Sequence, residues 1–149
     1  MTSDNLVKIS DSRVKVEDVS YAIPNNFYID LEMSGQSEDE LYWVSEDKSF
    51  FIDISTADAN DDNFIESFMK YFPEDYKKLV DFTSFEYNGL TGVYVVIGLS
   101  DTQSFELKAY ANKEKTKFID VVIETMNGNI GEVLKLKKVQ DFLYDIRMD

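Results

Sequence analysis

Hydrophobic and polar residues alternate along much of the chain with the period of two that is typical of β-strands facing a core on one side. The clearest case is residues 27–33, where Phe27, Ile29 and Leu31 share one side and mostly polar residues lie between them. Short connections favour antiparallel hairpins, including one across Glu46-Asp47-Lys48. Similar patterns predict further strands over residues 13–23, 41–44, 49–56, 82–87, 93–99, 105–111 and 118–126.

One segment departs from this alternation, because residues 93–97 carry no charged or small polar side chain on either face. A short continuous apolar run bounded by glycines is typical of a strand that is buried on both sides. We therefore expect residues 93–97 to form the centre of the sheet. Residues 89–92, with a glycine at each end, are expected to form the turn before it.

Two stretches change to the helical spacing of apolar residues. Residues 64–72 carry one apolar stripe and follow a run of short acceptor side chains, which favours a helix start. Residues 74–80 are expected to add a short second helix. The last element is predicted as a single helix over residues 130–147, where Asn129 and Glu132 have the spacing of a capping box.

This order of elements predicts an α+β fold with a mainly antiparallel β-sheet packed with two or three helices. The length of 149 residues fits one domain with a sizeable core. We expect residues 1–12 to be a disordered N-terminal segment, because they are polar and terminal. Residues 13–149 are expected to form a single α+β domain.

Charge narrows the class of partner. The chain has 15 Lys and Arg against 29 Asp and Glu, which gives a net charge of −14. The electric field of this negative charge repels nucleic acids and anionic membranes. The charge either keeps the protein soluble or also favours a basic partner. No secretion signal and no membrane-helix run is visible. We expect a cytoplasmic protein, or a secreted or lipid-anchored one if a signal precedes this sequence.

The sequence offers little for catalysis or metal binding. It contains no Cys and no His, which removes thiol, imidazole and Cys/His zinc chemistry. Residues 58–63 begin like a calcium-binding loop, but Asn63 and Met69 stand where that loop needs Gly and Glu. Helix capping explains these acids better. We predict no metal, no cofactor and no enzyme, while paired carboxylates keep a hydrolase open as a third alternative.

The polar sides of the alternating strands are the candidate binding surface. They combine aromatic and acidic side chains, and Lys108 and Glu124 share that side. Tyr and Phe supply contact area, and acids select a cationic partner. The alternative is an ordinary sheet face that is solvated or half covered by a helix. The candidate binding residues are Tyr28, Asp30, Glu32, Tyr42, Phe51, Asp53 and Tyr110.

Residues 21–27, YAIPNNF, resemble the opening of the PsbP/Mog1-like fold and, within it, that of small bacterial DcrB-like domains. The hairpin, the aromatic helix, the GLTGV sequence at residues 89–93 and the closing amphipathic helix extend the resemblance over residues 14–148. The resemblance implies an α/β/α sandwich. It also implies a binding role, as a partner-binding subunit, a lipoprotein or a chaperone for secreted toxins. It transfers no site residue, because the fold has no fixed site motif.

Taken together, these patterns predict a non-enzymatic protein-interaction domain with an accessory, chaperone-like or toxin-neutralising role. Its partner would be a basic or apolar protein. The contact would be made by the sheet face, or by an acidic loop at residues 34–47 or 56–63. The alternative function is small-molecule binding in an aromatic pocket between helix and sheet.

Overall fold

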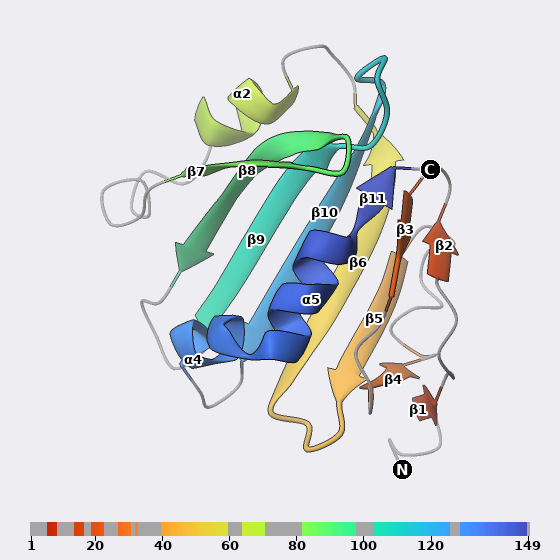
Figure 1. The fold of residues 1–149 in the computed structure, drawn as a ribbon, viewed down its shortest axis with the longest axis vertical. Helices are drawn as coiled ribbons and strands as arrows, with labels where there is room; N and C mark the ends of the chain where they lie inside the picture. The colour runs from red at the N-terminus through yellow and green to blue at the C-terminus, as the bar shows by residue number, and fades with distance from the viewer. Residues whose placement is uncertain are drawn as a thin grey trace.

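The computed structural model describes residues 6–8, 14–16, 19–22, 27–30, 32, 40–59, 64–70, 82–97, 103–125 and 129–148. Most of these residues belong to one large antiparallel sheet (Figure 1). In chain order its strands are β1 (Leu6–Lys8), β4 (Phe27–Asp30), β5 (Glu40–Ser45), β6 (Phe50–Asp58), β7 (Thr83–Tyr87), β8 (Leu90–Ile97), β9 (Gln103–Tyr110) and β10 (Lys117–Thr125). Their spatial order is β1-β4-β5-β6-β10-β9-β8-β7, so β6 and β10 lie in the middle.

Helices lie on both faces of this sheet. The helices α4 (Ile130–Lys135) and α5 (Lys137–Asp145) cross one face, as Figure 1 shows. A small sheet of β2 (Val14–Val16), β3 (Val19–Tyr21) and β11 (Arg147–Met148) joins them there, in the order β11-β3-β2. The helix α2 (Phe64–Lys70) packs on the opposite face. The predicted α+β fold, with a mainly antiparallel sheet between helices, is confirmed.

We call the side of the large sheet that carries α4 and α5 the core face, and the opposite side the outer face. The alternation read from the sequence puts the apolar residues of the strands on the core face. In the middle of the sheet Ile52 is opposite Ile123 and Ile54 is opposite Val121, and all four are buried. Because successive side chains in a strand point to opposite faces, the residues between them lie on the outer face.

The small sheet is fixed to the core through aromatic side chains. Tyr21 of β3 and Trp43 of β5 are both fully buried. The indole nitrogen of Trp43 donates a hydrogen bond to the hydroxyl of Tyr21 at 3.1 Å. The Tyr21 ring also meets Phe142 of α5 edge-on, with ring centroids 5.8 Å apart. This one side chain therefore links the small sheet, the large sheet and the last helix.

The prediction that residues 93–97 form the centre of the sheet is wrong. They belong to β8, which is next to the edge strand β7 in the order of described strands. Their apolar character has another cause, because elements cover β8 on both faces at this end of the sheet. Val93 packs against the residues of α2 on the outer face, and Tyr94 packs into the main core on the other.

The turn before β8 also differs from the prediction. It is centred on Asn88 and Gly89, whose φ values of 53° and 88° both lie in the left-handed region. Asn-Gly is the preferred pair for such a two-residue hairpin, so the sequence held this signal. Gly92 lies inside β8, where a Cβ would overlap the backbone of Lys108 and Ala109 in β9. Glycine is needed there for the close approach of two strands.

The predicted single helix over residues 130–147 is interrupted. Asn129 caps α4 by accepting a hydrogen bond from the backbone nitrogen of Gly131 at 2.8 Å. The chain then becomes extended at Leu136, with φ −63° and ψ 131°, before α5 begins. The amphipathic stripe persists across the break, which explains why periodicity did not reveal it. Arg147 is no longer helical and starts β11.

The N-terminal third contains more pairing than the sequence pattern indicated. The predicted strand over residues 13–23 is two short strands, β2 and β3, which pair with each other. Within residues 1–12, Leu6–Lys8 forms β1 and pairs with β4. The rest of that segment and the predicted helix at residues 74–80 lie outside the described residues.

We predict that Gly92→Ala lowers the free energy of unfolding by about 3 kcal/mol, because the added methyl group meets backbone atoms that cannot rotate away. Chemical denaturation followed by tryptophan fluorescence would measure the change. Thr91→Ala alters the exposed neighbouring position and is the matched control, with an expected change of less than about 0.5 kcal/mol. Equal stability of the two variants would contradict the close approach of β8 and β9.

Candidate functional site

The outer face carries most of the residues that the sequence analysis singled out. The strand registers place Tyr28, Asp30, Tyr42, Phe51, Asp53, Lys108, Tyr110 and Glu124 on this side of the large sheet. Glu32 lies two residues beyond β4 and is exposed, and its backbone nitrogen donates to Asp30 Oδ1 at 3.1 Å. Of the described helices, only α2 covers this face, at the end of the sheet near β8 and β9.

Tyr110 is set apart from the other candidates. It is only 7% exposed and packs with Ile65 of α2 and Val93 of β8. Its hydroxyl accepts a hydrogen bond from the backbone nitrogen of Ile65 at 3.3 Å. The structure therefore places Tyr110 in the small core beneath α2, whereas the candidates on β4, β5 and β6 remain partly exposed.

An aromatic pair forms the middle of the partly exposed region. The rings of Tyr42 and Phe51 stack with centroids 4.7 Å apart and planes inclined by 29°. Burial raises the pKa of the Tyr42 hydroxyl above its usual range, and the charges of Glu124, Asp53 and Asp30 raise it further. Three of the predicted acids therefore lie close enough to this pair to act on its polar end.

Beside the aromatic pair lies a group of acids that we call the carboxylate cluster: Glu40, Asp53, Asp120 and Glu106. They come from β5, β6, β10 and β9, which are four consecutive strands of the sheet. Glu40 and Asp120 both lie opposite Ser55, and Asp53 and Glu106 both lie opposite Val122. Sequence reasoning named Asp53, placed Glu40 in the acidic loop at residues 34–47, and did not single out Asp120 or Glu106. Only the strand order brings the four together.

Lys108 is the cation of this cluster among the described residues. Its amino group lies 3.3 Å from Asp120 Oδ2 and 3.6 Å from a carboxylate oxygen of Glu106. It also lies at similar distances from two aromatic rings, 5.2 Å from the centroid of Phe68 and 5.1 Å from that of Phe118. This positive charge thus pairs with two of the four carboxyl groups, and α2 partly covers it through Phe68.

Two carboxyl groups of the cluster are held away from water. Burial raises the pKa of Asp53 to about 7, and a hydrogen bond with Glu40 and the charges of Glu40 and Asp120 act in the same direction. Burial and the charge of Glu106 raise the pKa of Asp120 to about 7, against the opposing effect of Lys108. Asp53 Oδ1 and Asp120 Oδ1 are buried, and neither has a hydrogen-bond partner in the part of the chain that the structure describes. Two acceptor oxygens inside the cluster are therefore unsatisfied.

The described residues include no set of three or more His, Cys, Asp or Glu side chains arranged to hold a metal ion. Asp58, the first residue of the loop that resembles a calcium site, forms an ion pair with Lys117 at 3.2 Å. Residues 60–63 of that loop lie outside the described part of the chain, as do residues 34–39 of the other acidic loop. Residues 40–45 form β5, so that part of the second loop is a strand.

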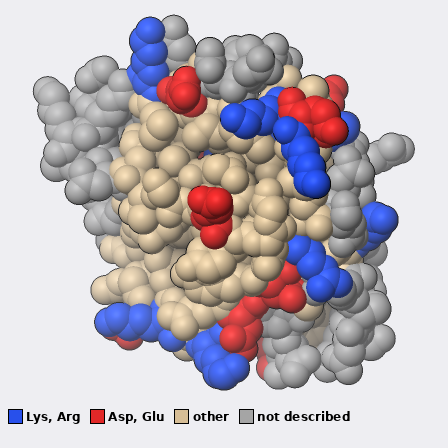
Figure 2. All heavy atoms as spheres, turned by 45° about the horizontal axis from the view of Figure 1, so that its top comes forward, with Lys and Arg blue, Asp and Glu red and all other residues tan. Residues whose placement is uncertain are grey.

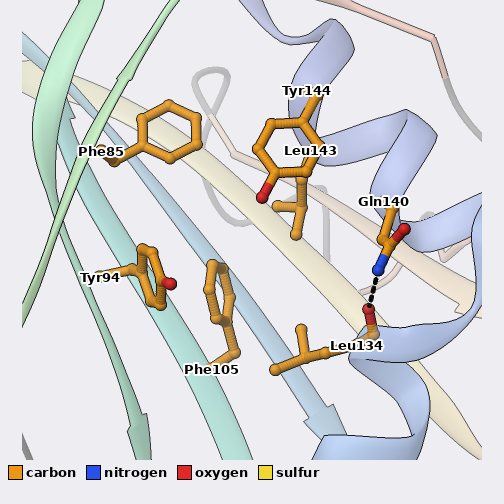
Figure 3. A pocket seen from close by; sticks show the side chains of 7 residues that line it. All are labelled: Phe85, Tyr94, Phe105, Leu134, Gln140, Leu143 and Tyr144. Carbon is orange, nitrogen blue, oxygen red and sulfur yellow. Dashed lines mark hydrogen bonds between the residues drawn. The ribbon is translucent and has the colours of Figure 1, made fainter.

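A second feature lies on the core face, between the sheet and the helices. A cavity of about 100 Å³ is lined by aromatic and aliphatic side chains and one amide, as Figure 3 shows. Figure 2 shows one side of the molecule. Uncharged residues fill much of its middle, and most charged residues lie around them. The lining residues of the cavity are Phe85, Tyr94, Phe105, Leu134, Gln140, Leu143 and Tyr144.

No family model matches the sequence, and no curated protein matches it. Solved structures do match its fold. A structure of the Ran-binding protein Mog1p of Saccharomyces cerevisiae aligns with a TM-score of 0.54 over 95% of this chain and 96% of that one, at 8% sequence identity. A structure of a mutant of the protein Mog1 gives the same TM-score and identity over 94% and 96%.

The chain has a Mog1/PsbP-like fold. The alignments cover nearly all of it, which confirms the resemblance that the sequence suggested for residues 14–148. At 8% identity a Mog1/PsbP-like fold transfers no residue and no partner to this chain. Membership of the DcrB-like group stays a prediction. Within the described part of the chain, no helix is both long and apolar enough to cross a membrane.

The raised pKa values predict that unfolding becomes easier as the pH rises. Asp53 and Asp120 bind their protons more tightly in the folded chain, so their stabilising contribution is full below their usual pKa of 3.8 and lost by about pH 7. Asp53→Asn should therefore remove about 1 kcal/mol of the difference in unfolding free energy between about pH 5.5 and about pH 8, after allowance for partial exposure.

Urea denaturation at the two pH values would measure this difference. Asp141→Asn, which removes an exposed carboxylate on α5, is the control and should leave the pH dependence unchanged. A pH dependence in Asp53→Asn equal to that of the original chain would show that Asp53 titrates as a solvated carboxyl.

Proposed function

We propose that this chain is a non-enzymatic protein-interaction domain that binds a basic segment of a partner protein through its outer face. The observation that carries the proposal is the carboxylate cluster beside the stacked rings of Tyr42 and Phe51. Among the described residues, the lysine of this cluster pairs with two of its four carboxyl groups, and two carboxyl oxygens lack a hydrogen-bond partner. A cationic side chain laid across the partly exposed side of the cluster would offset its excess of negative charge.

Arginine suits this surface better than lysine. Its planar guanidinium presents several N–H groups in a fixed geometry, can bridge two carboxylates and can stack on an aromatic ring. Tyr42 and Phe51 offer such a ring next to Asp53, which lies directly opposite Tyr42 in the sheet. Binding of a cation would also offset the repulsion between carboxylates, which adds to the effect of burial in raising the pKa values of Asp53 and Asp120.

The overall charge and the fold support a protein partner. The net charge of −14 opposes nucleic acids and anionic membranes, and it would speed the approach of a basic protein. The Mog1p structure is that of a Ran-binding protein, so a chain of this fold can bind another protein. An accessory, chaperone-like or toxin-neutralising role in the cytoplasm is the form of this function that we propose.

A second candidate function is small-molecule binding in the pocket on the core face. The observation that favours it is the cavity of about 100 Å³ between sheet and helices, lined by four aromatic rings. It is the kind of site that the alternative function requires. The cavity and the carboxylate cluster lie on opposite faces of the large sheet, so the two functions can be tested separately.

We predict that neutralising the outer face abolishes capture of a basic protein. The double variant Glu40→Gln and Glu124→Gln removes two partly exposed acids beside the aromatic pair. The matched control is Glu114→Gln and Glu132→Gln, which removes two exposed acids elsewhere and changes the net charge equally. Affinity capture from a lysate of the source cells, with quantitative mass spectrometry, would compare the three proteins.

The original chain and the control should retain the same basic protein, and high salt should release it because exposed charges are screened. The outer-face variant should retain at least about tenfold less, the factor that 1.4 kcal/mol of lost binding energy produces. Equal retention by the outer-face variant and the control would contradict binding at this face.

A further inference from the structure

The pocket on the core face has a buried apolar floor and a polar rim. Phe85, Phe105 and Leu143 are buried at its base, and none of its lining residues is charged. Gln140 and Tyr144 are exposed at its mouth. Figure 3 shows the hydroxyl groups of Tyr94 and Tyr144 directed into the space between the sheet and the helices. This combination suits a ligand with an apolar body and a polar end.

The walls of the pocket favour a flat ring. The rings of Phe85 and Tyr144 are nearly parallel, at 9°, with centroids 6.4 Å apart. Tyr94 and Phe105 form a second pair, with centroids 5.3 Å apart. Aromatic rings gain most from offset or edge-on contact with another ring, which an aliphatic ligand cannot supply.

The size of the pocket limits the ligand to one ring. Apolar cavities of about 150 Å³ bind benzene in other proteins. The cavity here is about 100 Å³ and is open at its mouth. A single ring can therefore enter with its substituent at the rim, whereas a fused ring system exceeds the enclosed space.

A polar contact is available at the mouth because the last two helices are interrupted at Leu136. The break leaves the carbonyl of Leu134 without the intrahelical partner that a continuous helix would supply. The side-chain nitrogen of Gln140 donates to this carbonyl at 3.3 Å, as Figure 3 shows. An amide nitrogen carries two N–H groups, so one remains for an oxygen at the pocket rim.

We propose that this pocket binds an uncharged molecule with one aromatic ring and one oxygen that accepts a hydrogen bond from Gln140, such as a phenol. The ring lies against Phe85, Phe105 and Leu143, and the oxygen stays near the mouth. A charged ligand is disfavoured, since it would lose hydration among uncharged side chains. This inference rests on the second candidate function, because it names the ligand class of that pocket.

The test uses phenol, toluene, cyclohexanol and benzoate as probes, with the methyl resonances of Leu134 and Leu143 followed by NMR. Phenol should shift both sets of resonances saturably, with a dissociation constant of about 1 mM for so small a ligand. Toluene should shift the same resonances. Cyclohexanol and benzoate should bind at least about fivefold more weakly, because one lacks the ring and the other is charged.

Three variants separate the parts of the proposal. Gln140→Leu should weaken phenol binding about fivefold, because the loss of one hydrogen bond lowers the affinity by about that factor. The same variant should leave toluene binding unchanged. Gln140→Trp should block the mouth and abolish binding of both rings. Lys137→Trp adds the same side chain at an exposed position of α5 outside the pocket, and it should change neither.

The outcomes that overturn the proposal are distinct. Equal binding of cyclohexanol and phenol at Leu134 and Leu143 would show that the ligand does not need an aromatic ring. The pocket would then still be a small-molecule site. Undiminished phenol binding in Gln140→Trp would place the probe outside the pocket. If none of the four probes shifts these methyl groups up to its solubility, both the ligand class and the second candidate function fail. The proposed protein interaction would be untouched, because its face lies on the other side of the sheet.

Discussion

The strands β6 and β10 pair along nine residues in the middle of the large sheet, from Asp58 opposite Lys117 to Phe50 opposite Thr125. This ladder fixes both faces of the molecule at once. On the core face it aligns the isoleucines and valines that α5 and the small sheet cover. On the outer face it puts Asp53 and Asp120 close enough for each to be affected by its neighbours' charge. A shift of one residue would exchange the two faces.

The pairing of β6 with β10 that builds the core therefore also fixes where the acids of the outer face lie. Their pKa values are raised because the strands and the side chains of neighbouring strands exclude water from them. Replacing such carboxyl groups by neutral residues would lower the electrostatic cost of folding. Groups that reduce the stability of the fold are common where a protein binds something else. This reasoning favours a role for the carboxylate cluster outside the fold itself.

The sequence was most informative where local pattern decides the structure. Period-two alternation located β4, β6, β9 and β10 and assigned their faces, and a continuous apolar run located β8. Helical spacing located α2 and the stretch that forms the last two helices. The sequence analysis failed where contacts between distant parts of the chain determine the structure. The order of strands, which brings Glu106 to Asp120, depends on pairings that no local pattern encodes. The pocket depends on a break at Leu136 inside an uninterrupted apolar stripe, which has no proline or glycine to mark it.

The C-terminal residues connect the two ends of the chain. Asp145 accepts a hydrogen bond from the backbone of Ala22, 123 positions away in sequence, and β11 then pairs with β3. The side chain of Asn88 donates to the backbone carbonyls of Tyr144 and Ile146 nearby. Contacts across such distances form slowly, because most of the chain must be brought together first. During synthesis, the apolar side of the sheet thus stays without its α5 cover until residues 137–145 have emerged.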